Sequence, residues 1–95
     1  MLIQQKHEDN KGSFFVEGTE GPLAEMTYSM AGQSLMIIDH TEVSDELRGK
    51  NTGYQLVHAA VEYARENKIK ILPLCPFARS VFDKKGQEFR DVLRV

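Results

Sequence analysis

The most constraining feature of this sequence is the join between an apolar, β-branched run at residues 34–43 and an amphipathic segment at residues 51–67. The join carries a basic residue, Arg48, and two glycines, Gly49 and Gly53. A strand that leads into a helix through such a loop points unpaired N–H groups beyond the helix start, where the helix dipole favours an anion. The join therefore predicts a strand–loop–helix unit that binds phosphate, although its spacing is neither a P-loop nor a dinucleotide fingerprint.

Length and charge exclude several classes of function. A chain of 95 residues predicts one domain, residues 1–95, near the lower end of comfortable core size. The net charge of −2 leaves no basic stripe for a nucleic acid. No apolar run approaches a membrane-spanning length, the N-terminus does not resemble a signal peptide, and the single cysteine, Cys75, excludes an internal disulfide. We therefore expect a cytoplasmic protein with no nucleic-acid and no membrane partner.

Short turns divide the chain into a regular series of elements. Alternating and continuous apolar patterns predict four strands joined as an antiparallel meander, at residues 2–8, 13–17, 23–30 and 34–43. Apolar residues at helical spacing predict the helix over 51–67. A parallel strand at 70–75 should follow, then a helix at 76–85 that begins at Pro76 and ends at Gly86, then a short helix at 88–93. The expected fold class is α/β (α+β).

The loop resembles the pyrophosphate-binding loop of the GNAT (general N-acetyltransferase) superfamily, Q/R-x-x-G-x-G/A. Here it reads Arg48-Gly49-Lys50-Asn51-Thr52-Gly53, with Asn51 where the family prefers glycine. A second segment resembles the family's N-x-x-A-x-x-x-Y motif: Ala78 matches, but Cys75 and Phe82 replace the asparagine and the tyrosine. The element order is similar to a minimal GNAT fold without its usual first two helices and final hairpin. In particular, the chain resembles the small single-domain GNAT-like proteins.

This resemblance implies acetyl-CoA as the co-substrate. Its pyrophosphate would lie on Arg48, Gly49, Lys50, Asn51, Thr52 and Gly53, with Asn51 left-handed and capping the helix. Its pantetheine arm would pair with the backbone of Thr41, Glu42 and Val43, and Cys75 and Phe77 would complete the cofactor site. The strands ending at Val43 and Cys75 would part for the thioester, and a backbone N–H near Thr41 would stabilise the oxyanion.

The proton donor and the base for transfer remain open at this point. Phe82 cannot protonate the leaving thiolate as the family's tyrosine does, so Cys75 or water would do so, or transfer would be slow. Glu42 and His40, expected on one strand face with Met36 and Ile38, are alternative bases for the amine.

Each of these residues also has an ordinary structural role available. Cys75 could simply fill the core, and Glu42 and His40 could be surface polarity at a strand end. The histidines, at positions 7, 40 and 58, show no metal-ligand spacing, so no metal site is expected.

We therefore expect an enzyme that transfers acetyl to an unidentified amine by direct attack in a ternary complex, with Cys75 and Glu42 as its catalytic residues. The alternative is a degenerate domain that binds acetyl-CoA or CoA with little or no catalysis. A partner-binding domain with no cofactor is a third interpretation. The acceptor, a small molecule or a protein or peptide amine, is not determined by these residues, and an exposed edge at 70–75 could invite a partner chain.

Overall fold

The computed structural model describes residues 1–94 and is built on a five-stranded sheet. The strands are β1 (Gln4–Glu8), β2 (Lys11–Val16), β3 (Ala24–Met30), β4 (Leu35–Val43) and β5 (Lys70–Pro73). They lie side by side in chain order, antiparallel from β1 to β4, and β5 is parallel to β4. The predicted meander and its parallel fifth strand are confirmed, each within two residues of the expected range.

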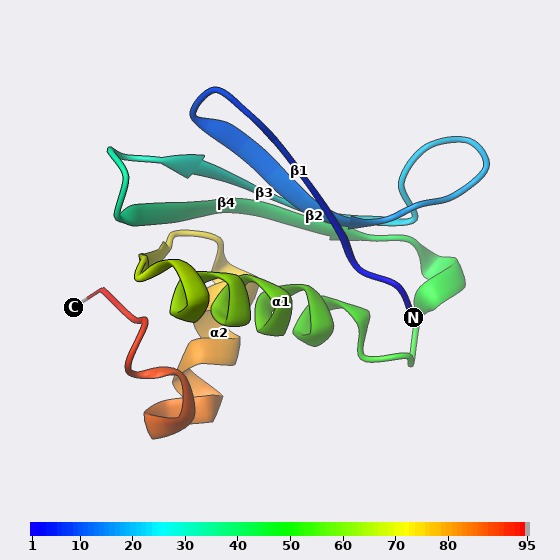
Figure 1. Cartoon of the computed structure of the whole chain (residues 1–95). Helices are drawn as coiled ribbons and strands as arrows, with labels where there is room; N and C mark the ends of the chain where they lie inside the picture. Colours follow the sequence, from blue (N-terminus) through cyan, green and yellow to red (C-terminus); the bar gives the residue numbers. More distant parts are fainter. Residues whose placement is uncertain (95) are drawn as a thin grey trace.

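Both α-helices, α1 (Thr52–Asn67) and α2 (Pro76–Lys85), lie on the same side of the sheet (Figure 1). Helix α1 turns its apolar stripe inward, and it ends at Lys68, whose left-handed backbone lets its N–H donate to the last carbonyls. Helix α2 begins at Pro76 and ends at Gly86 with a φ of 52°, as the sequence predicts. In residues 1–94 no helix combines the length and the apolar character needed to cross a bilayer.

The chain after α2 differs from expectation. The predicted helix over 88–93 is wrong: a single 3-10 turn, η2 (Gly86–Phe89), is followed by chain that runs beside β5. The Ile71 N–H donates to the Val92 carbonyl at 2.6 Å, and the Arg94 N–H donates to the Ile71 carbonyl at 2.8 Å. These bonds satisfy backbone groups on the edge of β5, which would otherwise face solvent unpaired.

The hydrophobic core fills the space between the helices and the inner face of the sheet. Met26, Met36, Ile38 and Leu56 are fully buried there, and each buried side chain of this size contributes about 1.5–3 kcal/mol. Tyr28 is also buried, with its hydroxyl accepting a hydrogen bond from Gln5 Nε2 at 2.8 Å. Burial raises the pKa of the Tyr28 hydroxyl above its ordinary value.

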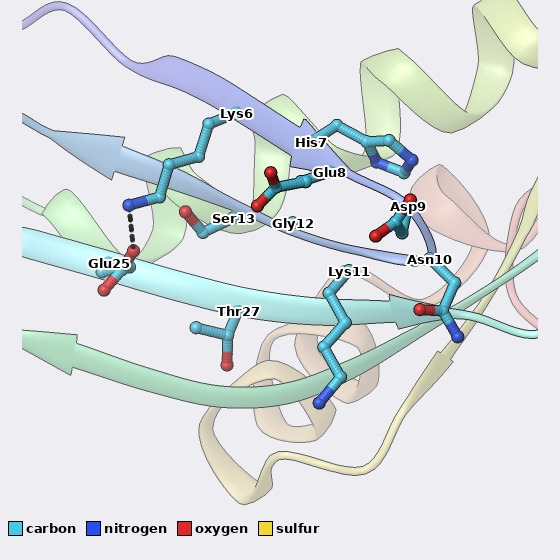
Figure 2. Close-up of a pocket in the computed structure, with 10 residues that line it drawn as sticks. All are labelled: Lys6, His7, Glu8, Asp9, Asn10, Lys11, Gly12, Ser13, Glu25 and Thr27. Carbon is cyan, nitrogen blue, oxygen red and sulfur yellow. Dashed lines mark ion pairs between the residues drawn. The ribbon is translucent and has the colours of Figure 1, made fainter.

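The opposite face of the sheet, here called the free face, carries none of the described helices (Figure 1). Cross-strand pairing places Lys6, Ser13 and Thr27 in one row of this face. The next row contains Glu25, which pairs with Glu42. Figure 2 shows the hollow that these strands form with the turn between β1 and β2, with a volume of about 660 Å³. A broad polar surface is thus left open beside β4.

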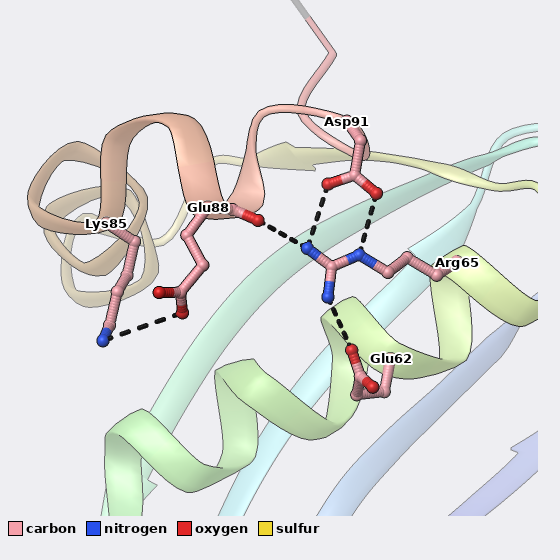
Figure 3. Close-up of polar contacts among 5 residues, drawn as sticks. All are labelled: Glu62, Arg65, Lys85, Glu88 and Asp91. Carbon is pink, nitrogen blue, oxygen red and sulfur yellow. Dashed lines mark hydrogen bonds and ion pairs between the residues drawn. The ribbon is translucent and has the colours of Figure 1, made fainter.

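An ion-pair network holds the C-terminal segment against α1 (Figure 3). Arg65 Nε donates to Asp91 Oδ2 at 2.8 Å, and Arg65 Nη1 donates to Glu62 Oε2 at 2.7 Å. The guanidinium also donates to the Glu88 carbonyl. Arg65 holds the pKa of the Asp91 carboxyl below its usual range. The network fixes the chain that covers the edge of β5.

Candidate functional site

Strands β4 and β5 stop pairing and diverge halfway along β4. Their parallel pairing ends at Ile38 and Pro73, and the Leu74 and Cys75 amides both donate to the Ile38 carbonyl at 3.1 Å. Residues 39–43 of β4 continue beyond that point without β5 alongside. This is the parting of strands that the resemblance to GNAT proteins implies.

A β-bulge at Asp39 decides which side chains face the gap. Thr27 pairs with His40 and Tyr28 pairs with Ile38, so Asp39 is the extra residue. The expectation that His40 and Glu42 share a face with Met36 and Ile38 is therefore wrong. The extra residue inverts the alternation, because side chains reverse face at every position of a strand.

The inversion gives the end of β4 two different faces. Thr41 pairs with buried Met26 and lies on the helix side of the sheet, whereas His40 and Glu42 lie on the free face. The Ser44 N–H donates to the Leu23 carbonyl at 2.7 Å. Because N–H groups alternate in direction along a strand, those of Thr41 and Val43 point away from β3 toward the gap. The Glu42 amide points the other way.

On the helix side, a cavity of about 400 Å³ lies between the end of β4, the start of α1 and the start of α2. Its lining residues are Thr41, Val43, Leu47, Arg48, Gly49, Asn51, Thr52, Gly53, Tyr54 and Phe77. Most of the cofactor residues expected from the sequence thus meet around one space. Three do not line it: Glu42, Lys50 and Cys75. Leu47 and Tyr54 were not foreseen, although each directly adjoins the motif.

The loop between β4 and α1 has the backbone of an anion site. Gly49 has a φ of 81°, and Asn51 is left-handed with φ 59° and ψ 31°. Asn51 occupies the N-cap position in the left-handed region, as expected, but its side chain makes no capping hydrogen bond. The N–H groups of the first turn, which have no intrahelical acceptor, consequently remain available to a ligand. The donor set fits a pyrophosphate.

The two basic residues of the loop are not equivalent. Arg48 lines the cavity, and its Nη2 donates to Asp45 Oδ1 at 2.8 Å in an exposed ion pair. Such a pair contributes little, so the guanidinium can turn to a phosphate at small cost. Lys50 is exposed and lies outside the lining, and its carbonyl accepts from Gln55 Nε2 at 3.1 Å. Of the two, only Arg48 is placed to reach a phosphate bound in this cavity.

Gly53 leaves room for the ring of a neighbour on α2. A Cβ atom at this position would lie 2.5 Å from Cζ of Phe77, far inside van der Waals contact. The sequence motif suggests that glycine makes room for the phosphate here. The close approach that the structure shows is instead to the Phe77 ring, which forms one wall of the cavity.

Cys75 is buried at the start of α2, directly across the gap from β4. Its Sγ donates to Thr41 Oγ1 at 3.3 Å. Burial by itself raises the pKa of the thiol, but its hydrogen bonds with the Thr41 side chain and with the backbone of Ala78, Phe77 and Thr41 outweigh this effect. The net pKa of Cys75 is therefore below its ordinary value, and the thiol is a better acid than free cysteine.

Phe82 and the histidines take structural or surface positions. Phe82 is buried, with its ring 5.6 Å from that of Phe89, and it offers no exchangeable proton. His40 Nε2 lies 3.0 Å from Glu42 Oε1 on the free face. His7 Nδ1 lies 3.0 Å from the Tyr28 hydroxyl, and His58 lies on the exposed side of α1. In residues 1–94 no group of histidine, cysteine or acidic side chains is arranged to hold a metal ion.

The sequence profile of the GCN5-related N-acetyl-transferase family matches residues 13–92. The chain belongs to this family. A GCN5-like protein from Staphylococcus aureus, solved by NMR, is 39% identical and aligns over 96% of this chain and 87% of its own length, with a TM-score of 0.73. Among curated proteins, none matches the sequence significantly.

More distant structures share the fold of this N-acetyltransferase. A ribosomal-protein-alanine N-acetyltransferase from Brucella melitensis biovar Abortus 2308 has a TM-score of 0.66 at 15% identity, over 81% of this chain and 62% of its own. The structure of AAC(6')-Iy with the bisubstrate analogue CoA-S-monomethyl-acetylneamine has a TM-score of 0.56 at 15% identity, over 93% of this chain and 67% of its own. Family membership makes the protein an acetyltransferase with acetyl-CoA as its co-substrate.

Proposed function

We propose that this acetyltransferase transfers the acetyl group to an amine by direct attack within a ternary complex. The observation that carries the proposal is the two-faced end of β4. Thr41 and Val43 line the cavity on the helix side, and His40 and Glu42 project from the same few residues onto the free face. Acetyl-CoA and amine would thus approach the gap from opposite sides of one strand.

Acetyl-CoA would be held by the loop and by the end of β4. The first-turn amides of α1 and the Arg48 guanidinium would bind its pyrophosphate, since both are positive and both border the cavity. The amides of Thr41 and Val43 would hydrogen-bond to its pantetheine arm and to the oxygen on which negative charge develops. Glu42 would take no part in cofactor binding, because its amide faces β3.

Glu42 and His40 would supply the base. The two side chains are in hydrogen-bond contact at 3.0 Å, so a proton taken from the acceptor ammonium by one can be shared with the other. Both are exposed, which leaves them accessible to an amine from solvent. The neutral amine nitrogen then forms the new C–N bond as the C–S bond of the thioester breaks.

Cys75 would protonate the departing CoA thiolate. Its sulfur lies at the gap, beside Thr41, and its lowered pKa makes it a suitable proton donor to a thiolate of ordinary basicity. Cys75 must stay reduced for this, which favours a reducing compartment such as the cytoplasm.

A second candidate function is binding of acetyl-CoA or CoA with little catalysis. The observation in its favour is Phe82, which is buried and cannot act as the acid at the position of the family's tyrosine. Transfer would then depend wholly on Cys75 or water.

The experiment is amine-dependent release of CoA from acetyl-CoA, followed with a thiol reagent. Glu42→Gln should lower the rate by about 10²-fold or more, the usual effect of losing a general base, while acetyl-CoA affinity is unchanged. Glu66→Gln is the matched control, because it removes the same charge from the exposed side of α1. Full activity in Glu42→Gln and His40→Asn would overturn the assigned base. Tight acetyl-CoA binding with no amine dependence would favour the second candidate.

A further inference from the structure

We propose that the free face holds a subsite for a second ammonium group, and that the acceptor is therefore a short diamine. The inference rests on the proposed function, because it places the reacting amine at His40 and Glu42. The subsite is formed by the carboxylate of Glu25, the hydroxyl of Ser13 and the ring of Phe15, all beside the hollow of Figure 2 or directly paired with it.

The first observation is that a primary ammonium already occupies this position. Lys6, on the edge strand β1, places its Nζ 3.4 Å from Glu25 Oε2 and 5.3 Å from the centroid of the Phe15 ring. A carboxylate and an aromatic face are the groups that bind an ammonium best. Figure 2 shows Lys6 reaching across the hollow to Glu25. The position of Lys6 thus shows that the subsite can bind a primary ammonium group.

The Lys6 ammonium is easily displaced. Its side chain is 62% exposed, whereas that of Glu25 is only 30% exposed. Exposed ion pairs contribute little to stability, so a ligand ammonium can replace Lys6 at small cost. The Glu25 carboxylate is less exposed than Lys6, and it stays in place to receive the ligand ammonium when Lys6 moves away.

The second observation is an unsatisfied hydroxyl in the same hollow. Ser13 is 1% exposed, and its Oγ has no hydrogen-bond partner among the described residues. It lies on β2 between Lys6 and Thr27, diagonally across from Glu25, and borders the hollow. A buried polar atom without a partner costs free energy. An ammonium carries three N–H donors, so one bound to Glu25 can also donate to the Ser13 hydroxyl.

The third observation places this subsite next to the proposed base. Glu25 pairs directly with Glu42 across β3 and β4, which puts two like charges opposite each other. Such a pair is destabilising by itself, with about 5 Å between the Cβ atoms. A diamine relieves it: one nitrogen stays protonated against Glu25, and the other gives its proton to the His40–Glu42 pair and attacks the thioester. The products are the mono-acetylated diamine and CoA. The CoA thiolate takes a proton from Cys75 or water, and the second proton that the amide nitrogen loses as the C–S bond breaks restores the donor.

The test compares 1,4-diaminobutane with butylamine, which has the same carbon chain and a single nitrogen. The wild-type protein should acetylate the diamine with a kcat/KM about tenfold higher or more, the worth of one charge-assisted contact. Glu25→Gln should abolish this preference, and Lys6→Met should increase it by emptying the subsite. Glu66→Gln controls for the loss of one negative charge.

The two variants change the preference in opposite directions, so loss of folding cannot imitate both results. Equal use of both amines by the wild-type protein, or an unchanged preference in Glu25→Gln, would overturn the diamine subsite and leave the proposed function intact. Acetylation of a lysine-containing peptide but not of the diamine would do the same. If acetyl-CoA binds and none of these amines is acetylated, both the subsite and the proposed transfer fail.

Discussion

Cys75 Sγ and Thr41 Oγ1 are 3.3 Å apart, in hydrogen-bond contact across the gap where β5 leaves β4. The two residues are distant in the sequence and come from different elements. Their contact joins the strand that would bind the pantetheine arm to the start of α2, and the Thr41 side chain is the main group that lowers the pKa of the thiol. The proposed role of Cys75 as proton donor can therefore be tested at this contact.

Replacing the thiol of Cys75 distinguishes a role in proton transfer from a role in core packing. Cys75→Ala should still bind acetyl-CoA, because the loop and the cavity lining are untouched, but acetyl transfer should fall by about 10²-fold. The measurement is the initial rate of CoA release with a saturating amine. A well-folded Cys75→Ala protein with full transfer would leave water as the proton donor and Cys75 as core filling.

The pKa of Cys75 should depend on Thr41. Since its folded pKa is lowered, this group stabilises the fold at pH above the unfolded thiol pKa, about 8.5, and the contribution is lost as the pH falls through the folded pKa. Thr41→Val removes the hydroxyl and should raise the pKa of Cys75. Ultraviolet thiolate absorbance against pH measures it, with Thr19→Val in an exposed turn as the control. Identical titrations would exclude the hydrogen bond as the cause.

The two basic residues of the loop should differ in their effect on cofactor affinity. Arg48→Ala should weaken acetyl-CoA binding about tenfold, because a charge-assisted phosphate contact is lost. Lys50→Ala removes the same charge two residues away, outside the cavity, and should have a much smaller effect. Calorimetric titration gives both values. Equal losses would point to general electrostatic attraction, and two unchanged affinities would place the pyrophosphate elsewhere.

Sequence patterns predicted the elements well because strands and helices carry their own periodicity. Residues 34–43, the loop at 48–53 and the helix over 51–67 lie where expected, and most of the motif borders one cavity. The bulge at Asp39 could not be foreseen, because no glycine or proline marks it and strict alternation assigns His40 to the inner face. This bulge places His40 and Glu42, the proposed base, on the face opposite to Thr41.

Contacts between residues that are distant in the sequence could not be predicted from local patterns either. Gly53 leaves room for the ring of Phe77, and the expected final helix was replaced by backbone bonds from residues 92–94 to Ile71. Neither follows from local pattern, since each depends on how α2 and the chain after it pack against the rest.

The Arg65–Asp91 pair should control how firmly the last residues hold to β5. Asp91→Asn should speed hydrogen exchange at the Arg94 amide and lower Tm by a few degrees, with Lys84→Gln as an exposed control. Because Arg65 lowers the pKa of Asp91, the stabilisation holds above the usual carboxyl pKa and is lost as the pH falls through the lower folded value. Unchanged exchange would mean that backbone bonds alone hold the segment.

The most direct test of the whole account is an NMR titration of the protein with acetyl-CoA, following backbone amides. We expect the largest shifts at Gly49, Asn51, Gly53 and Thr41, around the cavity between β4 and the start of α1. The chemical shifts of the amides of Lys11 and its neighbours in the β1–β2 hairpin should not change. Shifts concentrated on that hairpin, or none at millimolar acetyl-CoA, would contradict the assignment of the cofactor site.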